Sequence, residues 1–439
     1  MNFSFLSARF QRLTKEASWI VAGQITAIFG SLVLMRVLTE YLEPEQYGQL
    51  ALGLSVAAFF NQVAMGSISV GIVRFYSIAV EKDDLPGYLH ASNRLMGYAT
   101  TVVVAIALVL MTGMLWFGYT QWMGLVAAAL VFSVLSGYNV SLSGIQNAAR
   151  QRAVVAFHVG VDAWLKIFLA IGVMIWLGSS STAVVLGYAL SSLLVTCSQL
   201  YFLRLLTHPQ VTATHTHENW GRQIWLYSWP FATWGCFAWV QQGSDRWALQ
   251  TFATTQEVGL YALLFQLGYV PIGLLTGMAM GFLAPILYQH SGSAEDHTQN
   301  TSVHRLAWRI TFAVLLMTAL AFVFTFSQHE WIFQILVASN YHAVSYLLPW
   351  VVLAGGLFSA SQMLLLKLQS EMKQNTMITA KIVTAIIGVC LNIYGASQFG
   401  LQGVVTAIVA FSVITFLWMS WLAQYLPTSA SDSSLASLK

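Results

Sequence analysis

Long stretches without any charged side chain are the feature that most constrains this chain. Six segments contain no Asp, Glu, Lys or Arg: residues 95–117, 123–145, 182–203, 223–244, 258–289 and 310–328. Apolar stretches of about 18 residues are long enough to cross the hydrocarbon core of a membrane. Only 8% of the residues are charged, whereas soluble domains carry about a quarter. The sequence therefore predicts an all-α integral membrane protein.

The apolar segments predict about twelve transmembrane helices. Two apolar stretches are too long for one helix, and we divide them near Asn340 and at the glycine-rich residues 395–403, which favour a turn. The predicted spans are residues 17–39, 46–78, 92–117, 121–149, 153–177, 181–206, 221–250, 256–288, 305–327, 341–370, 376–397 and 401–425.

Basic residues fall mostly on one side of this arrangement. If the N-terminus is inside, sixteen Lys and Arg residues lie at inner loops and inner helix ends, while Arg36 and Arg246 lie at outer ends. Cytoplasmic loops are enriched in Lys and Arg, so we expect both termini to be cytoplasmic in a multi-pass protein of the inner membrane. No small-residue cleavage site follows a short apolar core, so the first helix is expected to remain as an anchor.

Two pairs of segments suggest an internal repeat. EPEQYGQLALG (43–53) aligns with TTQEVGLYALL (254–264), and IQNAARQR (145–152) aligns with LQSEMKQN (368–375). The offsets of 211 and 223 give the second half about a dozen extra residues, much of which we assign to the loop at 290–300. A duplicated unit of six helices has parallel topology, and the two halves are expected to enclose a central cavity.

The repeat predicts a domain organisation in five parts. These are a cytoplasmic N-terminal arm (1–16), a six-helix bundle (17–206), a cytoplasmic linker (207–220), a second six-helix bundle (221–425) and a cytoplasmic tail (426–439).

Asp162 and Lys166 are the ionisable pair predicted to lie deepest in the membrane. They are four residues apart in the span 153–177, so they share one helix face with the acid N-terminal to the base. Ionisable residues within spans are rare and often functional. Two interpretations stay open: a self-neutralising structural pair, or a pair on the cavity wall that contacts substrate or a proton.

Three further cations and one acid are predicted near span ends. Arg36 and Arg246 either reach the outer interface with their long side chains or line the outer mouth of the cavity; Asp245 adjoins Arg246. Arg74 either reaches the cytoplasmic interface or binds an anionic substrate at an inner gate. Asp245 joins Asp162 as a candidate for ion coupling.

The span 221–250 contains two tryptophans, Trp234 and Trp239, that are too deep for the aromatic belt at a membrane interface. They either pack between helices or line the cavity, where flat rings suit sugar faces.

Several chemistries lack their sequence motifs. The chain has no GxxxxGK[ST] phosphate loop, no HExxH zinc motif and no Gly-x-Ser-x-Gly elbow. Its basic residues form no patch suited to nucleic acid. We therefore expect no cofactor, no metal, no nucleic-acid partner and no enzymatic activity.

Four segments resemble the polysaccharide or oligosaccharide flippase family, which belongs with the multidrug and toxin extruders to one exporter superfamily. They are RVLTEYLEPEQYGQLAL (36–52), GIVRFYS (71–77), SGIQNAARQR (143–152) and SDRWALQTFATTQEVGLYA (244–262). The resemblance covers essentially the whole chain.

This resemblance implies a V-shaped pair of six-helix bundles. Members are thought to move a polyprenyl-diphosphate-linked oligosaccharide from the inner to the outer leaflet by alternating access, as in O-antigen and lipopolysaccharide biosynthesis. The partners it implies are that lipid-linked oligosaccharide, membrane lipids and a polysaccharide polymerase complex. A cavity for a diphosphate headgroup suits cations, and Arg36, Arg74, Lys166 and Arg246 are our candidates.

Two other functions are weighed against this one. A cation-coupled exporter of drugs or small amphiphiles usually has acidic residues in its first or seventh helix, but the first span here has none. A glycan polymerase or ligase needs a large outer loop with catalytic groups, whereas the longest predicted outer loop is about residues 328–341.

Overall fold

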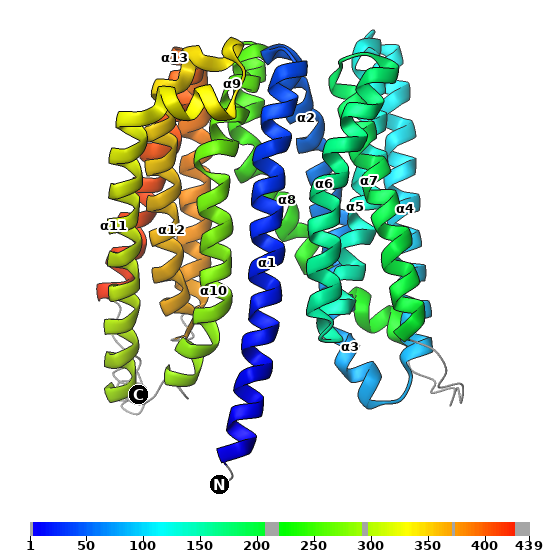
Figure 1. Ribbon diagram of the computed structural model, residues 1–439, viewed down its shortest axis with the longest axis vertical. Helices are drawn as coiled ribbons and strands as arrows, with labels where there is room; N and C mark the ends of the chain where they lie inside the picture. The colour runs from blue at the N-terminus through cyan, green and yellow to red at the C-terminus, as the bar shows by residue number, and fades with distance from the viewer. Residues whose placement is uncertain (1–2, 207–218, 292–296, 371–373, 426–439) are drawn as a thin grey trace, which may run out of the picture. The chain divides into compact units, whose positions relative to one another are not determined.

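The computed structural model describes residues 3–206, 219–291, 297–370 and 374–425, and within these ranges the regular structure is entirely helical (Figure 1). The first helices are α1 (Phe3–Tyr41), α2 (Pro44–Phe60), the π-helix η1 (Asn61–Gly66), α3 (Ser67–Glu81), α4 (Leu85–Trp116), the 3₁₀ turn η2 (Thr120–Trp122), α5 (Met123–Ala148), α6 (Arg152–Leu177) and α7 (Ser181–Leu206). The remaining helices are α8 (Trp220–Phe252), α9 (Thr255–Gly268), α10 (Val270–Ser291), α11 (His297–Leu336), the 3₁₀ segment η3 (Ser339–Leu347), α12 (Leu348–Ser370) and α13 (Gln374–Tyr425). The predicted all-α fold class is confirmed.

The described helices form about twelve spans, as the sequence predicts. Ten segments are long and apolar enough to cross a membrane. One of them, residues 379–424, holds two helices, because Gly400 breaks α13 with a φ of 54° and a ψ of −133°. The helix α8 is long enough to span but less apolar, and it supplies the twelfth span.

The chain divides by its internal contacts into two compact units, Met1–Gln242 and Gly243–Lys439. The division falls within α8, whose larger part packs with the N-terminal unit. Most of the predicted linker (207–220) and all of the predicted tail (426–439) lie outside the described residues. The predicted arm at 1–16 is the beginning of α1 from Phe3 onward.

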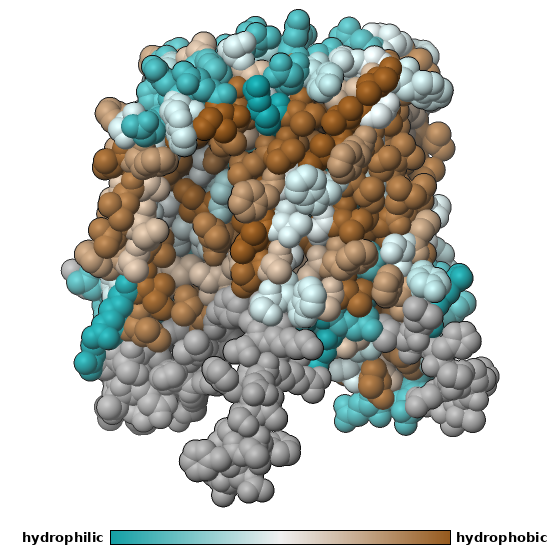
Figure 2. All heavy atoms as spheres, viewed as in Figure 1, coloured by the Kyte–Doolittle hydropathy of each residue, from teal (hydrophilic) through white to brown (hydrophobic). Residues whose placement is uncertain are grey.

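Apolar side chains cover the middle of the helices on the face shown in Figure 2, and hydrophilic side chains gather at the helix ends. In the N-terminal unit, α4 exposes Val102, Leu108 and Val109, while in the C-terminal unit α11 exposes Leu316 and Leu320. Such surfaces are expected where helices contact acyl chains.

Both halves share a capping interaction, which supports the internal repeat. In each half, a side chain near the start of the second helix accepts a hydrogen bond from the first backbone amide of a later helix. Gln46, the third residue of α2, accepts a hydrogen bond at Oε1 from the backbone N of Ser181, 3.0 Å away. Glu257, the third residue of α9, accepts one at Oε2 from the backbone N of Leu401, 2.6 Å away. Each capped helix follows a glycine of positive φ, 91° at Gly178 and 54° at Gly400. These bonds satisfy amides that a helix N-terminus leaves without intrahelical partners.

Removing the cap in the C-terminal unit tests this interpretation. Replacing Glu257 with alanine leaves the Leu401 amide without its acceptor, so we expect the free energy of unfolding to fall by about 0.5–2 kcal/mol. Thermal unfolding of the purified protein in detergent measures the change. The control is Glu45→Ala, which removes an exposed acid from the first turn of α2. An equal effect of both variants would contradict a specific capping role for Glu257.

Candidate functional site

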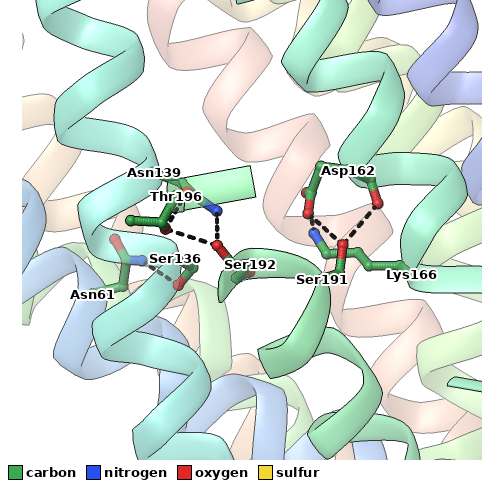
Figure 3. Close-up of polar contacts among 8 residues, drawn as sticks. All are labelled: Asn61, Ser136, Asn139, Asp162, Lys166, Ser191, Ser192 and Thr196. Carbon is green, nitrogen blue, oxygen red and sulfur yellow. Dashed lines mark hydrogen bonds and ion pairs between the residues drawn. The ribbon is translucent and has the colours of Figure 1, made fainter. Parts of the chain in front are cut away.

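Asp162 and Lys166 form an ion pair inside the N-terminal unit (Figure 3). Both lie on α6, four residues apart, and Lys166 Nζ is 2.5 Å from Asp162 Oδ2. The hydroxyl of Ser191 on α7 donates to Asp162 Oδ1 over 2.9 Å. The acid therefore has both oxygens engaged within the unit, one by the lysine and one by the neighbouring helix.

Two aromatic rings complete the surroundings of Lys166. Its Nζ lies 5.6 Å from the centroid of the Phe132 ring on α5 and 5.9 Å from that of Tyr188 on α7. A cation over an aromatic face is stabilised electrostatically. The two charged side chains are only 23% and 24% exposed. The charge of Lys166 is thus compensated from α5, α6 and α7, which is the arrangement that the structural interpretation requires.

A second polar group joins α5 to α7 in the same unit, as Figure 3 shows. Asn139 Nδ2 donates to the carbonyl of Ser192 over 3.2 Å, and the hydroxyl of Thr196 donates to Asn139 Oδ1 over 2.6 Å. Asn61 in the π-helix η1 donates to the hydroxyl of Ser136 on α5 over 2.9 Å. Sequence analysis missed these residues. The polar positions within α7 nevertheless indicated a helix face that forms hydrogen bonds with neighbouring helices in a membrane.

The second candidate group lies in the C-terminal unit, at the end of α8. Asp245 is 5% exposed, and its Oδ2 accepts a hydrogen bond from the hydroxyl of Tyr261 on α9, 2.6 Å away. Its Oδ1 accepts one from the backbone N of Arg246 over 2.7 Å. Asp245 and Tyr261 are each eight residues from Ala253 in the turn between α8 and α9. Their equal distances from the turn between the predicted spans 221–250 and 256–288 could have indicated this pair.

Arg246 differs from the other candidate cations in its partners. Its guanidinium lies 5.2 Å from the centroid of the Phe265 ring, and its Nε is buried without a hydrogen-bond partner. Phe265 in turn stacks on Tyr269, with ring centroids 4.6 Å apart. Among the ion pairs of the described residues, none includes Arg246. The guanidinium thus makes no ion pair of 4 Å or less among the described residues, although Asp245 is its neighbour in the chain.

The remaining predicted cations lie elsewhere on the N-terminal unit. Arg36 forms an exposed ion pair with Glu40, one turn further along α1, with 3.2 Å between Nη2 and Oε2. Arg74 is exposed on α3. Neither joins the group around Lys166, so the structure brings together Asp162 with Lys166 and Asp245 with Arg246.

The two predicted tryptophans have different surroundings. Trp239 donates from Nε1 to the carbonyl of Ser55 over 2.7 Å, and its ring packs edge-on against Phe59 with centroids 5.0 Å apart. These contacts match the packing interpretation. Trp234 is 42% exposed and lies 5.6 Å from the ring of Phe237. Of the two, Trp234 is exposed and Trp239 is half-buried.

The described residues include no group of three or more His, Cys, Asp or Glu side chains placed to hold a metal ion. The chemistry that both candidate groups offer is electrostatic. The N-terminal group is an ion pair, and the C-terminal group places the Asp245 carboxylate and the Arg246 guanidinium beside aromatic rings without an ion pair between the two side chains.

Solved structures of exporters share this fold. An inward-facing multidrug resistance MATE family transporter of the MOP superfamily matches with a TM-score of 0.63 and 14% identity, over 93% of this chain and 96% of that chain. The lipid II flippase MurJ, in an inward closed conformation, matches with a TM-score of 0.64 and 11% identity, over 93% and 88%. A Vibrio cholerae MATE transporter matches with a TM-score of 0.56 and 15% identity, over 95% and 96%. At these identities the likeness concerns the fold.

Sequence comparison gives the family. No curated protein matches the chain. The model of a family described as "Polysaccharide biosynthesis protein" matches residues 13–291, well over half of the 439 residues. The chain is a multi-pass membrane protein with the fold of the MOP-superfamily transporters, and it belongs to the polysaccharide biosynthesis protein family.

Proposed function

We propose that this protein is a transporter that flips a polyprenyl-diphosphate-linked oligosaccharide from the inner to the outer leaflet by alternating access. The family and the fold support this function. The flipped lipid would supply the assembly of a cell-surface polysaccharide, such as an O-antigen of lipopolysaccharide, and a polysaccharide polymerase complex would use it. Both termini would be cytoplasmic in the inner membrane. The protein would move the substrate without catalysing a reaction on it.

The observation that carries this proposal is the Arg246 guanidinium, which forms no ion pair within 4 Å among the described residues. A diphosphate group has several anionic oxygens, and a planar guanidinium binds such oxygens with two parallel hydrogen bonds. A guanidinium near the end of a span that lacks an ion-pair partner suits an anionic ligand. Arg36 and Arg74 are further candidate cations, whereas Lys166 is paired with Asp162, and Trp234 and Trp239 are the candidates for contact with sugar rings.

The second candidate function is a cation-coupled exporter of drugs or small amphiphiles. The fold of the MATE transporters supports it, and the buried carboxylate of Asp245 is an acid near the end of α8, where coupling is conceivable. Asp162 is the other candidate coupling acid. Within the apolar span of α1, Ser18–Tyr41, the one acid is the exposed Glu40, in the last turn. We therefore favour the lipid-linked oligosaccharide.

Deletion of the gene separates the two functions. We expect loss of surface glycan and accumulation of the lipid-linked precursor in the inner leaflet, because a charged diphosphate headgroup does not cross the hydrocarbon core unaided. Leaflet-specific labelling of the precursor checks this result, with a plasmid-borne copy of the gene as the control. Normal surface glycan together with new sensitivity to drugs would instead favour the exporter.

A further inference from the structure

The two halves of the chain differ by one inserted segment, which the helix bounds locate. The starts of α2 and α9 are 211 positions apart, those of α4 and α11 are 212 apart, and those of α5 and α12 are 225 apart. Nearly all of the extra residues therefore lie between the start of α11 and the start of α12. The prediction that the loop at 290–300 holds much of the excess is wrong. The helix α11 begins only one position later than the offset of 211 between α2 and α9 would place it. Residues 292–296 of that loop lie outside the described residues.

The inserted segment begins where α11 has already crossed the membrane. Gln328 interrupts α11 with a φ of −126° and a ψ of 15°. The residues before it, 304–327, alone extend about 36 Å at the helical rise of 1.5 Å per residue, which exceeds the hydrocarbon thickness of about 30 Å. In Figure 1 the chain after this point, coloured yellow, lies across the end of the C-terminal unit instead of continuing α11. Residues 328–347, which contain the extra residues and are called the inserted segment below, therefore lie near the membrane surface.

Side-chain contacts hold the inserted segment in place. His329 Nδ1 is 3.0 Å from the hydroxyl of Ser345 in η3, and His342 Nε2 is 3.2 Å from the carbonyl of Val337. Phe333 is fully buried and meets the His342 ring with centroids 6.2 Å apart. The short helix at the end of α11 is thus a packed part of the C-terminal unit.

This short helix has three distinct faces. Phe333 and Val337, four residues apart, are buried against the unit. Glu330 and Gln334, also four apart, form an exposed polar stripe. Trp331 and Ile335 form an exposed apolar stripe, with exposures of 55% and 51%. Residues four apart lie on one helix face. The helix therefore has one face that packs on protein, one polar face suited to water and one apolar face suited to apolar surroundings.

We propose that the helix formed by residues 329–336 lies in the membrane interface, with Trp331 and Ile335 in the acyl boundary and Glu330 and Gln334 in water. Its partner is the phospholipid surface at the end of the unit predicted to be extracytoplasmic. Helices that lie in an interface carry an apolar stripe beside a polar one, and tryptophan is enriched at headgroup level. The apolar stripe also follows the exposed Phe324 and Phe326 of the preceding span. The helix anchors the end of α11 and is independent of what the protein transports.

Spin labels in liposomes of bacterial phospholipid test this placement. In a background where Cys197, Cys236 and Cys390 are replaced by alanine, single cysteines are introduced as Trp331→Cys, Ile335→Cys, Glu330→Cys and Gln334→Cys. The ratio of oxygen to nickel-chelate accessibility of the nitroxide is then measured by electron paramagnetic resonance. We expect this ratio to be severalfold higher at 331 and 335 than at 330 and 334.

Two outcomes would overturn the proposal. Equal, high nickel accessibility at all four positions would place the helix in water. Low accessibility to both reagents at 331 and 335 would place a protein partner on the apolar stripe. If Trp331→Cys does not fold, the neighbouring pair Gln334→Cys and Ile335→Cys decides between the same outcomes, because these two positions lie on the two exposed stripes.

Discussion

Replacing Arg246 with glutamine is expected to weaken the apparent affinity for the lipid-linked oligosaccharide by about 10- to 100-fold. Hydrogen bonds to charged groups contribute about 1.5–3 kcal/mol, and each 1.4 kcal/mol corresponds to about tenfold in affinity. Glutamine removes the charge and the two-pronged donor. Arg246→Lys keeps the charge but loses the planar fork, so it should retain part of the affinity. The measurement is transport into proteoliposomes as a function of substrate concentration.

The matched control for Arg246 is Arg222→Gln. It removes an exposed arginine from the first turn of the same helix, α8, and is expected to leave the affinity unchanged. Thermal unfolding of each variant shows whether the stacking of Arg246 on Phe265 also supports the fold. Unchanged affinity in a folded Arg246→Gln variant would mean that the guanidinium is a packing group on the ring, and would remove the main support for an anion site there.

Replacing Lys166 with alanine is expected to reduce glycan export while the protein stays in the membrane. The change leaves the Asp162 carboxylate without its cation, and a lone charge at the centre of a span costs about 2.5–3.5 kcal/mol on insertion scales. We also expect lower thermal stability of the N-terminal unit. Export in cells and unfolding in detergent are measured on the same variant. Full export and full stability would contradict any role for the pair.

The double variant Asp162→Asn with Lys166→Met separates packing from transport. It is neutral, so it should regain most of the stability lost in Lys166→Ala, since neither side chain is then an unpaired charge in the membrane. The matched comparison is Ser191→Ala, which removes only the neutral hydrogen bond to Asp162. Export that returns with stability assigns the pair to packing. Export that stays lost in a stable protein assigns it to the transport path.

Much of the fold follows from sequence because membrane spans are set by local composition. Uncharged apolar segments gave the spans, and the glycines at 395–403 marked the break that Gly400 makes in α13. The repeat around Gly48 and Gly259 located two helices that begin at equivalent positions, Pro44 and Thr255. These features depend on near neighbours in the chain.

The missed features depend on contacts between distant residues or on backbone detail. The π-helix η1 begins with the polar residues Asn61 and Gln62, but no sequence rule links such a pair to a π-helix. The capping of the Leu401 amide by Glu257 joins residues 144 positions apart. Sequence alone shows which helix Glu257 begins but not which helix end its side chain meets.

In the candidate sites, too, some features follow from the sequence and others depend on contacts between distant residues. The pairing of Asp162 with Lys166 follows from their spacing on one helix, and the structure adds Ser191 and two aromatic rings from other helices. The charge of Arg246 was evident in the sequence. Its lack of a carboxylate partner, among the residues described, was not, because the adjacent Asp245 bonds to Tyr261 instead.

The most direct test of the proposed function is flipping of a fluorescent polyprenyl-diphosphate oligosaccharide in liposomes that contain the purified protein. An impermeant quencher added outside reports which leaflet holds the label. We predict that wild-type protein makes the whole label pool accessible over time, that Arg246→Gln slows this exchange at limiting substrate, and that Arg222→Gln does not. A label that stays in its original leaflet with folded wild-type protein, both with and without a proton gradient, would contradict the account.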